Sequence, residues 1–457
     1  MFTKGPHGMK GKVHFLSVHR TTLIPCLRSG SHKSKKDMDG THKIKWTLYI
    51  SLASMFIFVS VTEVGPFSSM KRLYSSYEPD FRHKYVIVFD GGSTGTRIHI
   101  FTFVNNSSSG HLALENEYFE EVKPGLSNYA HKPQNAANSI LHLLDKAKDL
   151  VPPSLWDETP VALKATAGLR LLPNALSDSI LEAISEAFRS SPFLTDEESV
   201  GVLDGEDEGL YAWYTLNFLL GRLNEASHSV VALDLGGGST QVTFTPVELD
   251  SFIRTPKDYI VLKKIQNKTM PVYTHSYLGL GLMSARVGIL HLSSENSVSV
   301  KNDETKFRSS CIHPHTKHTW KHDRKDYIVK GRKDEKYGFQ ECYDTVVEFL
   351  GDTIDKPEEL RRRDIYALSY YFDRSRDLGL IDAENGHTSV GDIMKACKDA
   401  CSLKKPKEPL LCLDCSYISA LLHYGLGLPE RKEILLAKRI DGIETSWGLG
   451  AAFNLLR

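Results

Sequence analysis

The sequence predicts an α/β protein in which two similar hairpins hold a polyphosphate between them. Each hairpin contains a glycine- and hydroxyl-rich loop, over residues 90–97 in the first and 234–241 in the second. The loops follow residues 85–89 and 230–233, two apolar runs typical of buried strands, and each leads into a second strand-like stretch. Glycines let successive backbone N–H groups point at one anion, and the hydroxyls add further donors. Two such loops facing each other would form a clamp for a polyphosphate.

Each loop begins with an aspartate, Asp90 or Asp234, whose carboxylate suits a divalent cation, usually through water when the cation is Mg²⁺. The sequence contains neither a Walker loop, Gly-x-x-x-x-Gly-Lys-Ser/Thr, nor a dinucleotide-binding fingerprint. The alternative is that each loop is only a tight hairpin turn. Because two matching loops occur in one chain, we favour phosphate binding.

Length and charge limit the classes of protein to consider. The 457 residues allow two or three domains, and a composition of 41% hydrophobic and 25% charged residues fits a globular protein. Lys and Arg number 56, as do Asp and Glu, so the chain lacks the net basic charge that nucleic-acid partners usually require. We expect no nucleic-acid partner, and we expect a monomer.

A basic segment and an apolar segment precede the first hairpin. Residues 1–45 contain ten Lys and Arg against Asp37 and Asp39, and residues 46–62 carry no charge. As a helix, 46–62 would span about 25 Å, which suits the thinner membranes of the early secretory pathway. Because basic flanks stay cytosolic, we expect a signal anchor with a cytosolic tail, a stem over 63–84 and a luminal remainder. A buried core helix and a cleaved signal peptide are the alternatives.

Six of the seven cysteines follow the apolar segment. They are Cys311, Cys342, Cys397, Cys401, Cys412 and Cys415. In an oxidising lumen such cysteines are expected to form disulfides. A zinc site made by the last four is the alternative. Sequons at Asn106 and Asn267 would be open to glycosylation in the same compartment.

Polar residues also mark two strand-to-helix junctions between the loops. A strand ends at Thr166, before a helix expected over 177–189, and a hydroxyl at a strand's C-terminal end lies where α/β proteins bind ligands. The second junction opens a helix with three acidic residues, 206–208, which are common in a first turn because of the helix dipole. Hydrolysis of a phosphoanhydride needs a base that takes a proton from water. We choose Glu208, because Gly209 follows it and leaves room for substrate or water.

Five segments in this order resemble the signature regions of the apyrases, the nucleoside triphosphate diphosphohydrolase family. They are DGGSTGTR (90–97), ATAGLRLLP (165–173), GEDEGLYAW (205–213), LDLGGGSTQ (233–241) and SWGLGAA (446–452). The resemblance covers nearly all of residues 85–457. One apolar segment near the N-terminus, with none near the C-terminus, is similar to the secretory-pathway branch of this family, the nucleoside diphosphatases of the Golgi and endoplasmic reticulum.

The resemblance implies a fold of two ribonuclease-H-like lobes, as in the actin, hexokinase and Hsp70 superfamily, with the nucleotide in the cleft between them. One hairpin would belong to each lobe. Lobe I would comprise residues 85–205 and 435–457, and lobe II residues 206–434. By the same resemblance Cys311 pairs with Cys342, and Cys401 with Cys412. Cys397 and Cys415 flank the second pair and could form a third, nested bridge.

The resemblance also assigns roles to individual residues. Glu208 would be the base that activates water, and Ser239 would help to hold that water. The residues that would bind phosphate are Ser93, Thr94, Gly95, Gly237, Gly238 and Ser239. Those that would surround a hydrated Ca²⁺ or Mg²⁺ are Asp90, Thr166, Asp234 and Trp447, although core packing is the commoner use of a tryptophan. Base stacking is assigned to Tyr370 or Tyr371. Gly91 stands where the family usually has alanine, which should loosen the turn slightly.

The resemblance therefore predicts a metal-dependent hydrolase of the secretory lumen that removes the terminal phosphate of GDP, IDP or UDP, and of triphosphates weakly. A nucleotide-binding switch of the actin or Hsp70 kind, either non-catalytic or an ATPase, is the first alternative, but the chain lacks the substrate domain of an Hsp70. A sugar kinase is the second, and no feature of the sequence supplies a sugar pocket. We place the protein in the Golgi or secretory-pathway membrane. Whether the anchor is later cleaved to release a secreted form stays open.

Overall fold

A computed structural model describes residues 81–106, 111–265, 268–294, 299–301, 304–322, 325–333, 336–404, 406 and 408–456. Contacts divide the chain into two units, and the larger one contains residues 84–103 and 114–457, with all the elements discussed below except the ends of β1, β2 and β3. The predicted tail, anchor and stem up to residue 80 lie outside the described residues, as do Asn267 and the side chain of Asn106. Among the described residues, no helix has both the length and the apolar character needed to cross a membrane.

A five-stranded sheet contains the first phosphate hairpin, in the strand order β3-β2-β1-β4-β5. Its strands are β1 (Phe81–Gly91), β2 (Thr96–Asn106), β3 (His111–Val122), β4 (Val161–Ala165) and β5 (Val200–Val202). Strands β1 and β4 are parallel, so both end at the same edge of the sheet. There the backbone N–H of Thr166 donates a hydrogen bond to the carbonyl of Gly91 at 3.1 Å. This pairing places the first loop beside the polar end of β4.

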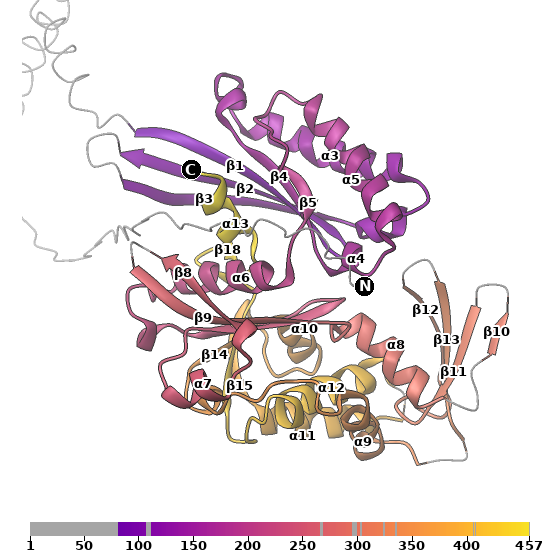
Figure 1. Ribbon diagram of the computed structural model, residues 1–457. Helices are drawn as coiled ribbons and strands as arrows, with labels where there is room; N and C mark the ends of the chain where they lie inside the picture. Colours follow the sequence, from indigo (N-terminus) through magenta and orange to yellow (C-terminus); the bar gives the residue numbers. More distant parts are fainter. Residues whose placement is uncertain are drawn as a thin grey trace, which may run out of the picture. The chain divides into compact units, whose positions relative to one another are not determined.

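Amphipathic helices cover this sheet because their apolar residues recur at helical spacing. Helices α3 (Pro133–Leu150) and α5 (Asn174–Arg189) pack together on one face (Figure 1). The helix expected over 177–189 is thus confirmed and begins three residues earlier. A short helix, α4 (Ala167–Arg170), follows β4. On the opposite face, Phe453 of α13 (Gly448–Leu455) packs against Phe103, with ring centroids 5.6 Å apart.

The second phosphate hairpin, β6–β7, lies within a seven-stranded sheet of order β15-β16-β14-β6-β7-β9-β8. Its strands are β6 (Val231–Leu235), β7 (Ser239–Phe244), β8 (Ile260–Ile265), β9 (Lys268–Leu278), β14 (Ile365–Ser369), β15 (Asn385–Ser389) and β16 (Glu433–Ala437). Strands β6 and β7 are antiparallel, with Asp234 opposite Gln241, so both predicted loops connect β-hairpins. Because β16 pairs in this sheet, residues 435–437 lie with it rather than with the five-stranded sheet.

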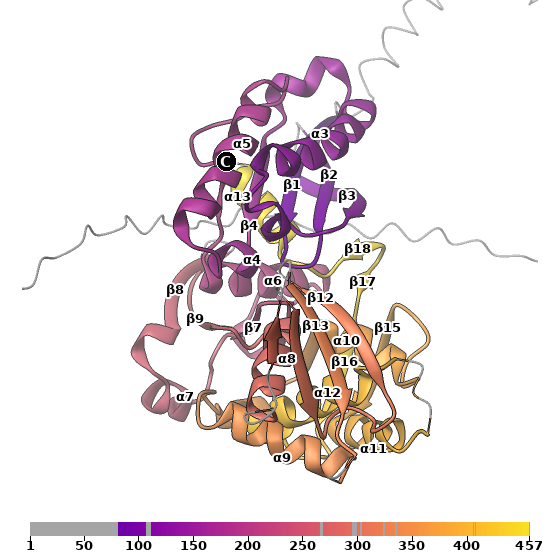
Figure 2. The ribbon, with the colours of Figure 1, turned by 90° about the vertical axis from the view of Figure 1, so that its right-hand side faces the viewer.

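Helix α6 (Gly205–Leu219) packs against this sheet on one side and against α13 on the other, where Figures 1 and 2 show it between the two sheets. All of its residues from Glu208 onward are buried, as expected for a helix that is apolar all round. Figure 1 shows other helices on the opposite face of the seven-stranded sheet. These are α8 (Leu282–Leu292), α9 (Phe339–Leu350), α10 (Tyr370–Asp377), α11 (Val390–Cys401) and α12 (Leu411–Ala420), with a π-helical turn over Leu421–Gly425.

Smaller elements complete the described structure. A four-stranded sheet has the order β10-β11-β13-β12. Its strands are β10 (Ser299–Lys301), β11 (Glu304–Ser309), β12 (Lys317–His322) and β13 (Lys325–Gly331). The other short elements are α7 (Leu249–Arg254), β17 (Arg439–Ile440) and β18 (Ile443–Glu444). Five 3₁₀ turns lie at Leu126–Tyr129, Pro153–Glu158, Ala226–His228, Lys257–Tyr259 and Glu358–Arg361.

Three disulfides join Cys311 to Cys342, Cys397 to Cys415 and Cys401 to Cys412. The two predicted pairs and the nested third bridge are confirmed, and these bridges exclude the zinc alternative.

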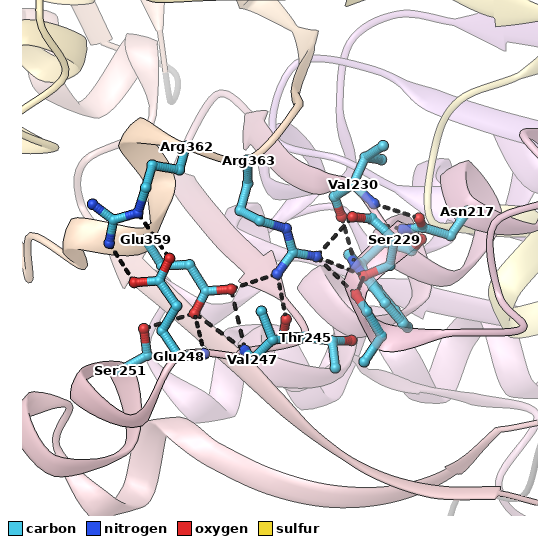
Figure 3. Close-up of polar contacts among 12 residues, drawn as sticks. Asn217, Ser229, Val230, Thr245, Val247, Glu248, Ser251, Glu359, Arg362 and Arg363 are labelled. Atoms are coloured by element: carbon cyan, nitrogen blue, oxygen red, sulfur yellow. Dashed lines mark hydrogen bonds and ion pairs between the residues drawn. The ribbon is translucent and has the colours of Figure 1, made fainter.

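A buried ion pair anchors α7 and the loop that joins it to β7 to the 3₁₀ turn at Glu358–Arg361, which lies more than 100 positions later in the chain. Figure 3 shows the Glu359 carboxylate beside Arg363, Val247 and Ser251. It accepts hydrogen bonds from the backbone N–H of Val247 at 3.1 Å and from Ser251 Oγ at 2.8 Å. Arg363 also donates to the carbonyl oxygens of Thr245 and Ser229. Both carboxylate oxygens of Glu359, which is fully buried, therefore have partners.

Candidate active site

A cavity of about 420 Å³ is lined by both phosphate loops and by residues of the β4–α4 junction, α6, α8, α10 and the β17–β18 segment. Most of the predicted site residues line this cavity. They are Asp90, Ser93, Thr94, Thr166, Glu208, Asp234, Gly237, Gly238, Ser239, Tyr370 and Trp447. Two do not: Gly95 packs against Glu121, and Tyr371 is only 2% exposed, with its hydroxyl hydrogen-bonded to Thr240. The structure therefore brings most of the predicted site residues together around one cavity, and leaves one phosphate-loop residue and one tyrosine outside it.

The two loops face each other across a short distance. A Cβ added to Gly237 would lie 2.2 Å from Ser93 Oγ, and one added to Gly238 would lie 2.7 Å from the Ala167 Cβ. Any side chain at Gly237 would therefore occupy the position of the serine hydroxyl. The glycines are required here for close approach rather than for a left-handed backbone. The result is the two-sided arrangement of N–H groups and hydroxyls that a polyphosphate clamp needs.

Glu208 is the one member of the acidic trio that lines the cavity. Helix α6 begins at Gly205, where the Asp204 side chain accepts a hydrogen bond from the backbone N–H of Glu206 at 2.9 Å. One turn into the helix, Glu208 is buried, with 7% of its surface exposed. Burial raises the pKa of the Glu208 carboxyl to about 8, the nearby Arg170 guanidinium opposes this rise, and Asp234 and Asp90 add to it. A carboxyl with this pKa is matched to proton abstraction near neutral pH.

The reason for which the sequence singled out Glu208 is wrong. Gly209 leaves no room for substrate, because a Cβ there would lie 2.6 Å from Thr243 Oγ1 and 3.0 Å from Thr274 Oγ1. The glycine instead allows α6 to pack closely on β7 and β9. Glu208 faces the cavity because of where the helix begins, not because of its neighbour.

A polar network around Glu208 was not predicted from the sequence. Arg170 forms an ion pair with Glu208, and its Nη2 lies 3.4 Å from Ser239 Oγ. Gln241 Nε2 lies 2.8 Å from Ser239 Oγ, 2.9 Å from Ser276 Oγ and 3.2 Å from Glu208 Oε2. Glu208 and Ser239 thus share two donors, which orient the carboxylate and the hydroxyl together.

The positions of Asp90 and Asp234 fit a hard cation. Each is 7% exposed, and each has one buried carboxylate oxygen, Oδ1, with no hydrogen-bond donor among the described residues. The other oxygen of Asp90 accepts from Arg97 Nη1 at 3.0 Å. Burial raises the pKa of Asp234, and a hydrogen bond from Ser369 opposes that rise. Buried carboxylate oxygens without donors are costly unless a cation is near, so the donor set suits a divalent metal.

Trp447 reaches the cavity from the segment that follows the β17–β18 hairpin. A buried pair fixes this segment, because Glu117 Oε1 lies 2.7 Å from His99 Nδ1 while Glu117 Oε2 accepts from the backbone N–H of Glu444 at 2.7 Å. The His99 ring also lies against Gly448, whose added Cβ would be 3.2 Å from it. No local sequence pattern indicates this support, since its members lie on β2, β3 and β18.

Comparison with known proteins finds a family and several relatives. The GDA1/CD39 (nucleoside phosphatase) family matches residues 77–457. Ectonucleoside triphosphate diphosphohydrolase 5 of Gallus gallus is 44% identical over 379 residues, which are 82% of this chain and 87% of the relative. Nucleoside diphosphate phosphatase ENTPD5 of Homo sapiens is 42% identical over 379 residues, with 82% and 87% covered. Ectonucleoside triphosphate diphosphohydrolase 6 of Rattus norvegicus is 42% identical over 380 residues, with 81% and 82% covered.

A solved structure shares the fold. It is a nucleoside triphosphate hydrolase from Neospora caninum, with a TM-score of 0.63 and 15% identity, and the match covers 90% of this chain and 96% of that one. At this identity the likeness concerns the fold alone. It agrees with the α/β class and the pair of ribonuclease-H-like lobes that the sequence implied.

Proposed function

Because this chain belongs to the GDA1/CD39 nucleoside phosphatase family, we propose that it is a divalent-cation-dependent nucleoside diphosphatase. One observation supports this most directly: a buried base, Glu208, lines the same cavity as two facing phosphate loops and two aspartates. A relative that is 42% identical is named a nucleoside diphosphate phosphatase. GDP, IDP and UDP are the substrates we propose, with triphosphates hydrolysed weakly.

In this mechanism the loops bind the phosphates through Ser93, Thr94 and the backbone N–H groups of Gly237 and Gly238. A Ca²⁺ or Mg²⁺ ion, held by Asp90 and Asp234 with Thr166 and Trp447 nearby, would neutralise phosphate charge when bound. Ser239 accepts or donates a hydrogen bond to hold the attacking water.

Glu208 takes a proton from that water while the water oxygen attacks the terminal phosphorus. The bond from this phosphorus to the bridging oxygen breaks, and inorganic phosphate and a nucleoside monophosphate leave. Gln241 and Arg170 contact both Glu208 and Ser239, so they hold the carboxylate and the hydroxyl in fixed positions relative to each other during proton transfer. The loops would hold the substrate phosphates in line with the water, which is the main catalytic requirement of phosphoryl transfer.

We also propose that the enzyme acts in the lumen of the Golgi or another secretory compartment. Three disulfides support an oxidising environment. The uncharged segment 46–62 after a basic tail supports a membrane anchor with the catalytic unit in the lumen. Glycosylation at Asn106 and Asn267 would follow from that location.

The test is phosphate release from GDP, IDP and UDP by the purified full-length chain, with Ca²⁺ or Mg²⁺ and without any sugar acceptor. We expect release that stops in EDTA and returns when either ion is added. Asp234→Ala should weaken the metal dependence even at saturating nucleotide. Full activity in EDTA would overturn the metal assignment. Nucleotide binding without release would favour a switch, and transfer of the phosphoryl group to an added sugar, in place of phosphate release, would favour a kinase.

A further inference from the structure

The four-stranded sheet carries a local excess of positive charge. Residues 304–336, which include β11, β12 and β13, contain ten Lys and Arg against five Asp and Glu, whereas the whole chain contains 56 basic and 56 acidic residues. One face of the sheet belongs to the protein core, because Phe307, Tyr327 and Val329 are buried there in one cluster with residues of α8. Side chains alternate between the two faces of a strand, so the residues between these three point to the outer face.

Three cations form a row across this outer face. Arg308 of β11 is the register partner of Lys330 of β13, and Lys317 of β12 is the partner of the same lysine. Arg308 and Lys317 are exposed, and Lys330 is half-buried. Neighbouring strands lie about 4.8 Å apart, so the three residues span about 10 Å. We call them the basic row. Like charges directly opposite each other destabilise a sheet, so the basic row destabilises this one unless an anion lies across it.

The acidic residues of the outer face are paired with other lysines. Glu304 Oε2 lies 3.5 Å from Lys306 Nζ, and Asp326 Oδ1 lies 3.6 Å from Lys321 Nζ. Both acids lie four positions along their strands from the basic row. Within the part of the chain that the structure describes, no member of the basic row makes an ion pair. Its three charges are therefore available to a partner.

The layout of the basic row favours an extended and stiff polyanion. The cations lie across strands on an exposed sheet face, whereas a small ligand is usually held in a concave site. A sulfated polysaccharide fits this layout, because its anionic groups recur on successive sugar rings of a stiff chain. A flexible acidic peptide would first have to be ordered, which costs free energy. Anionic lipids are concentrated in the cytoplasmic leaflet, away from a luminal domain.

We propose that the basic row binds a sulfated polysaccharide of the glycosaminoglycan class, which rests on the luminal location in the proposed function but not on the proposed reaction. The guanidinium of Arg308 and the two ammonium groups would each donate to a sulfate oxygen. The polysaccharide would lie across β11, β13 and β12 and cancel the repulsion within the row. The surface is separate from the catalytic cavity, because no member of the basic row lines it.

The experiment measures the Kd of the full-length chain for a heparin oligosaccharide at physiological ionic strength. Removing two charges of the row, by Lys317→Gln together with Lys330→Gln, should raise this Kd roughly three- to thirtyfold, the range for two exposed ion pairs. The matched control is Lys321→Gln together with Lys325→Gln, which removes the same charge from the same two strands. These lysines lie four and five positions from the row, roughly 13 Å or more, and the Debye length is about 8 Å. The control should keep the wild-type Kd.

Desulfated heparin, polyglutamate and phosphatidylserine vesicles are the comparison ligands. A loss of heparin binding confined to the Lys317 and Lys330 variant, with desulfated heparin bound weakly by the wild type, supports the inference. Equal losses in both variants would mean that only net charge matters, and this overturns it. Absence of heparin binding by the wild type overturns it as well, as does tighter binding of polyglutamate or of the vesicles. Both variants should release phosphate from GDP at the wild-type rate, and a failure of the proposed reaction would leave the binding results unchanged.

Discussion

Glu208 combines a buried carboxylate with two hydrogen-bonding neighbours, Arg170 and Gln241, which suggests a group that is held in place to accept one proton. We predict that Glu208→Gln lowers kcat by roughly 10²–10⁴ with little change in nucleotide affinity. The amide keeps the shape of the side chain but cannot accept the proton of water. Steady-state kinetics and nucleotide binding by calorimetry provide the measurement. Near-normal turnover in a folded variant would assign the base elsewhere, and Asp207→Asn would then be tested.

The raised pKa of Glu208 also predicts how activity depends on pH. A base works when deprotonated, so kcat should rise with pH and level off above the pKa of Glu208, which is about 8 without metal. A bound cation cancels the charges of Asp90 and Asp234, two of the groups that raise this pKa. The inflection should therefore lie below 8 at saturating Ca²⁺ or Mg²⁺. A kcat that falls across the same range would mean that the group acts as an acid.

Among the site residues, the sequence predicted those that belong to compact motifs. Asp90, Asp234 and Ser239 could be found because each lies in a glycine-rich loop with a recognisable composition. Arg170 lies inside one of the matched segments, yet its partner, Glu208, is 38 positions away, and only the fold brings the two together. Contacts of this length leave no periodic or local signal in a single sequence.

The close approach of the two hairpins predicts that a side chain at Gly237, in the β6–β7 loop, weakens substrate turnover. In Gly237→Ala the new Cβ would displace the Ser93 hydroxyl, because it would otherwise lie 2.2 Å from that oxygen. One donor to phosphate would be lost, and kcat/KM should fall roughly ten- to hundredfold, the equivalent of one hydrogen bond to a charged group. The melting temperature should hardly change.

Gly201→Ala is the matched control for this substitution. Gly201 lies in β5, where an added Cβ meets nothing nearer than Lys164 Nζ at 3.9 Å. Its kinetics should match the wild type. Equal effects of the two substitutions would show that the loss comes from a general change in glycine content and not from contact between the loops.

Helix α7 is anchored by the buried carboxylate of Glu359, so the contribution of this anchor can be measured as a change in the free energy of unfolding. In Glu359→Gln the acceptor charge opposite Arg363 is lost, and the free energy of unfolding should fall by roughly 2–4 kcal/mol, because an unpaired buried guanidinium is costly. The nearby Glu248→Gln breaks an exposed pair with Arg362 and should cost at most about 1 kcal/mol. Urea unfolding gives both values. The residues of Figure 3 do not line the cavity, so KM should stay unchanged in both variants.

Most elements near the site could be predicted because their sequence patterns are local. Both hairpins, the helix α5 and the start of α6 follow from apolar runs, glycines and capping residues. The sheet β10–β13 and the pairing of β16 with β14 could not be predicted, because they depend on strands that are distant in sequence or short. The His99–Glu117 pair was missed for the same reason.

For the whole molecule, the disulfides join the helices on one face of the seven-stranded sheet. Cys397 and Cys401 lie one turn apart on α11, and Cys412 and Cys415 lie one turn apart on α12, so two bridges connect the same pair of helices. The third bridge ties Cys342 of α9 to Cys311, which lies two residues after the end of β11. None of these cysteines lines the cavity. Their role should therefore be structural.

Reduction should lower the melting temperature, whereas alkylation of the folded, unreduced protein should leave hydrolysis unchanged. In the chain-entropy model, sequence separations of 31, 18 and 11 residues correspond to about 3–4 kcal/mol for each bridge taken singly. Peptide mapping without reduction should show Cys311 joined to Cys342 and the α11 peptide joined to the α12 peptide. Loss of activity on alkylation of the unreduced enzyme would mean that a free thiol takes part, because all six of these cysteines would otherwise be protected. A melting temperature that reduction does not change would show that the bridges add nothing to the stability that the buried cores of the two sheets already provide.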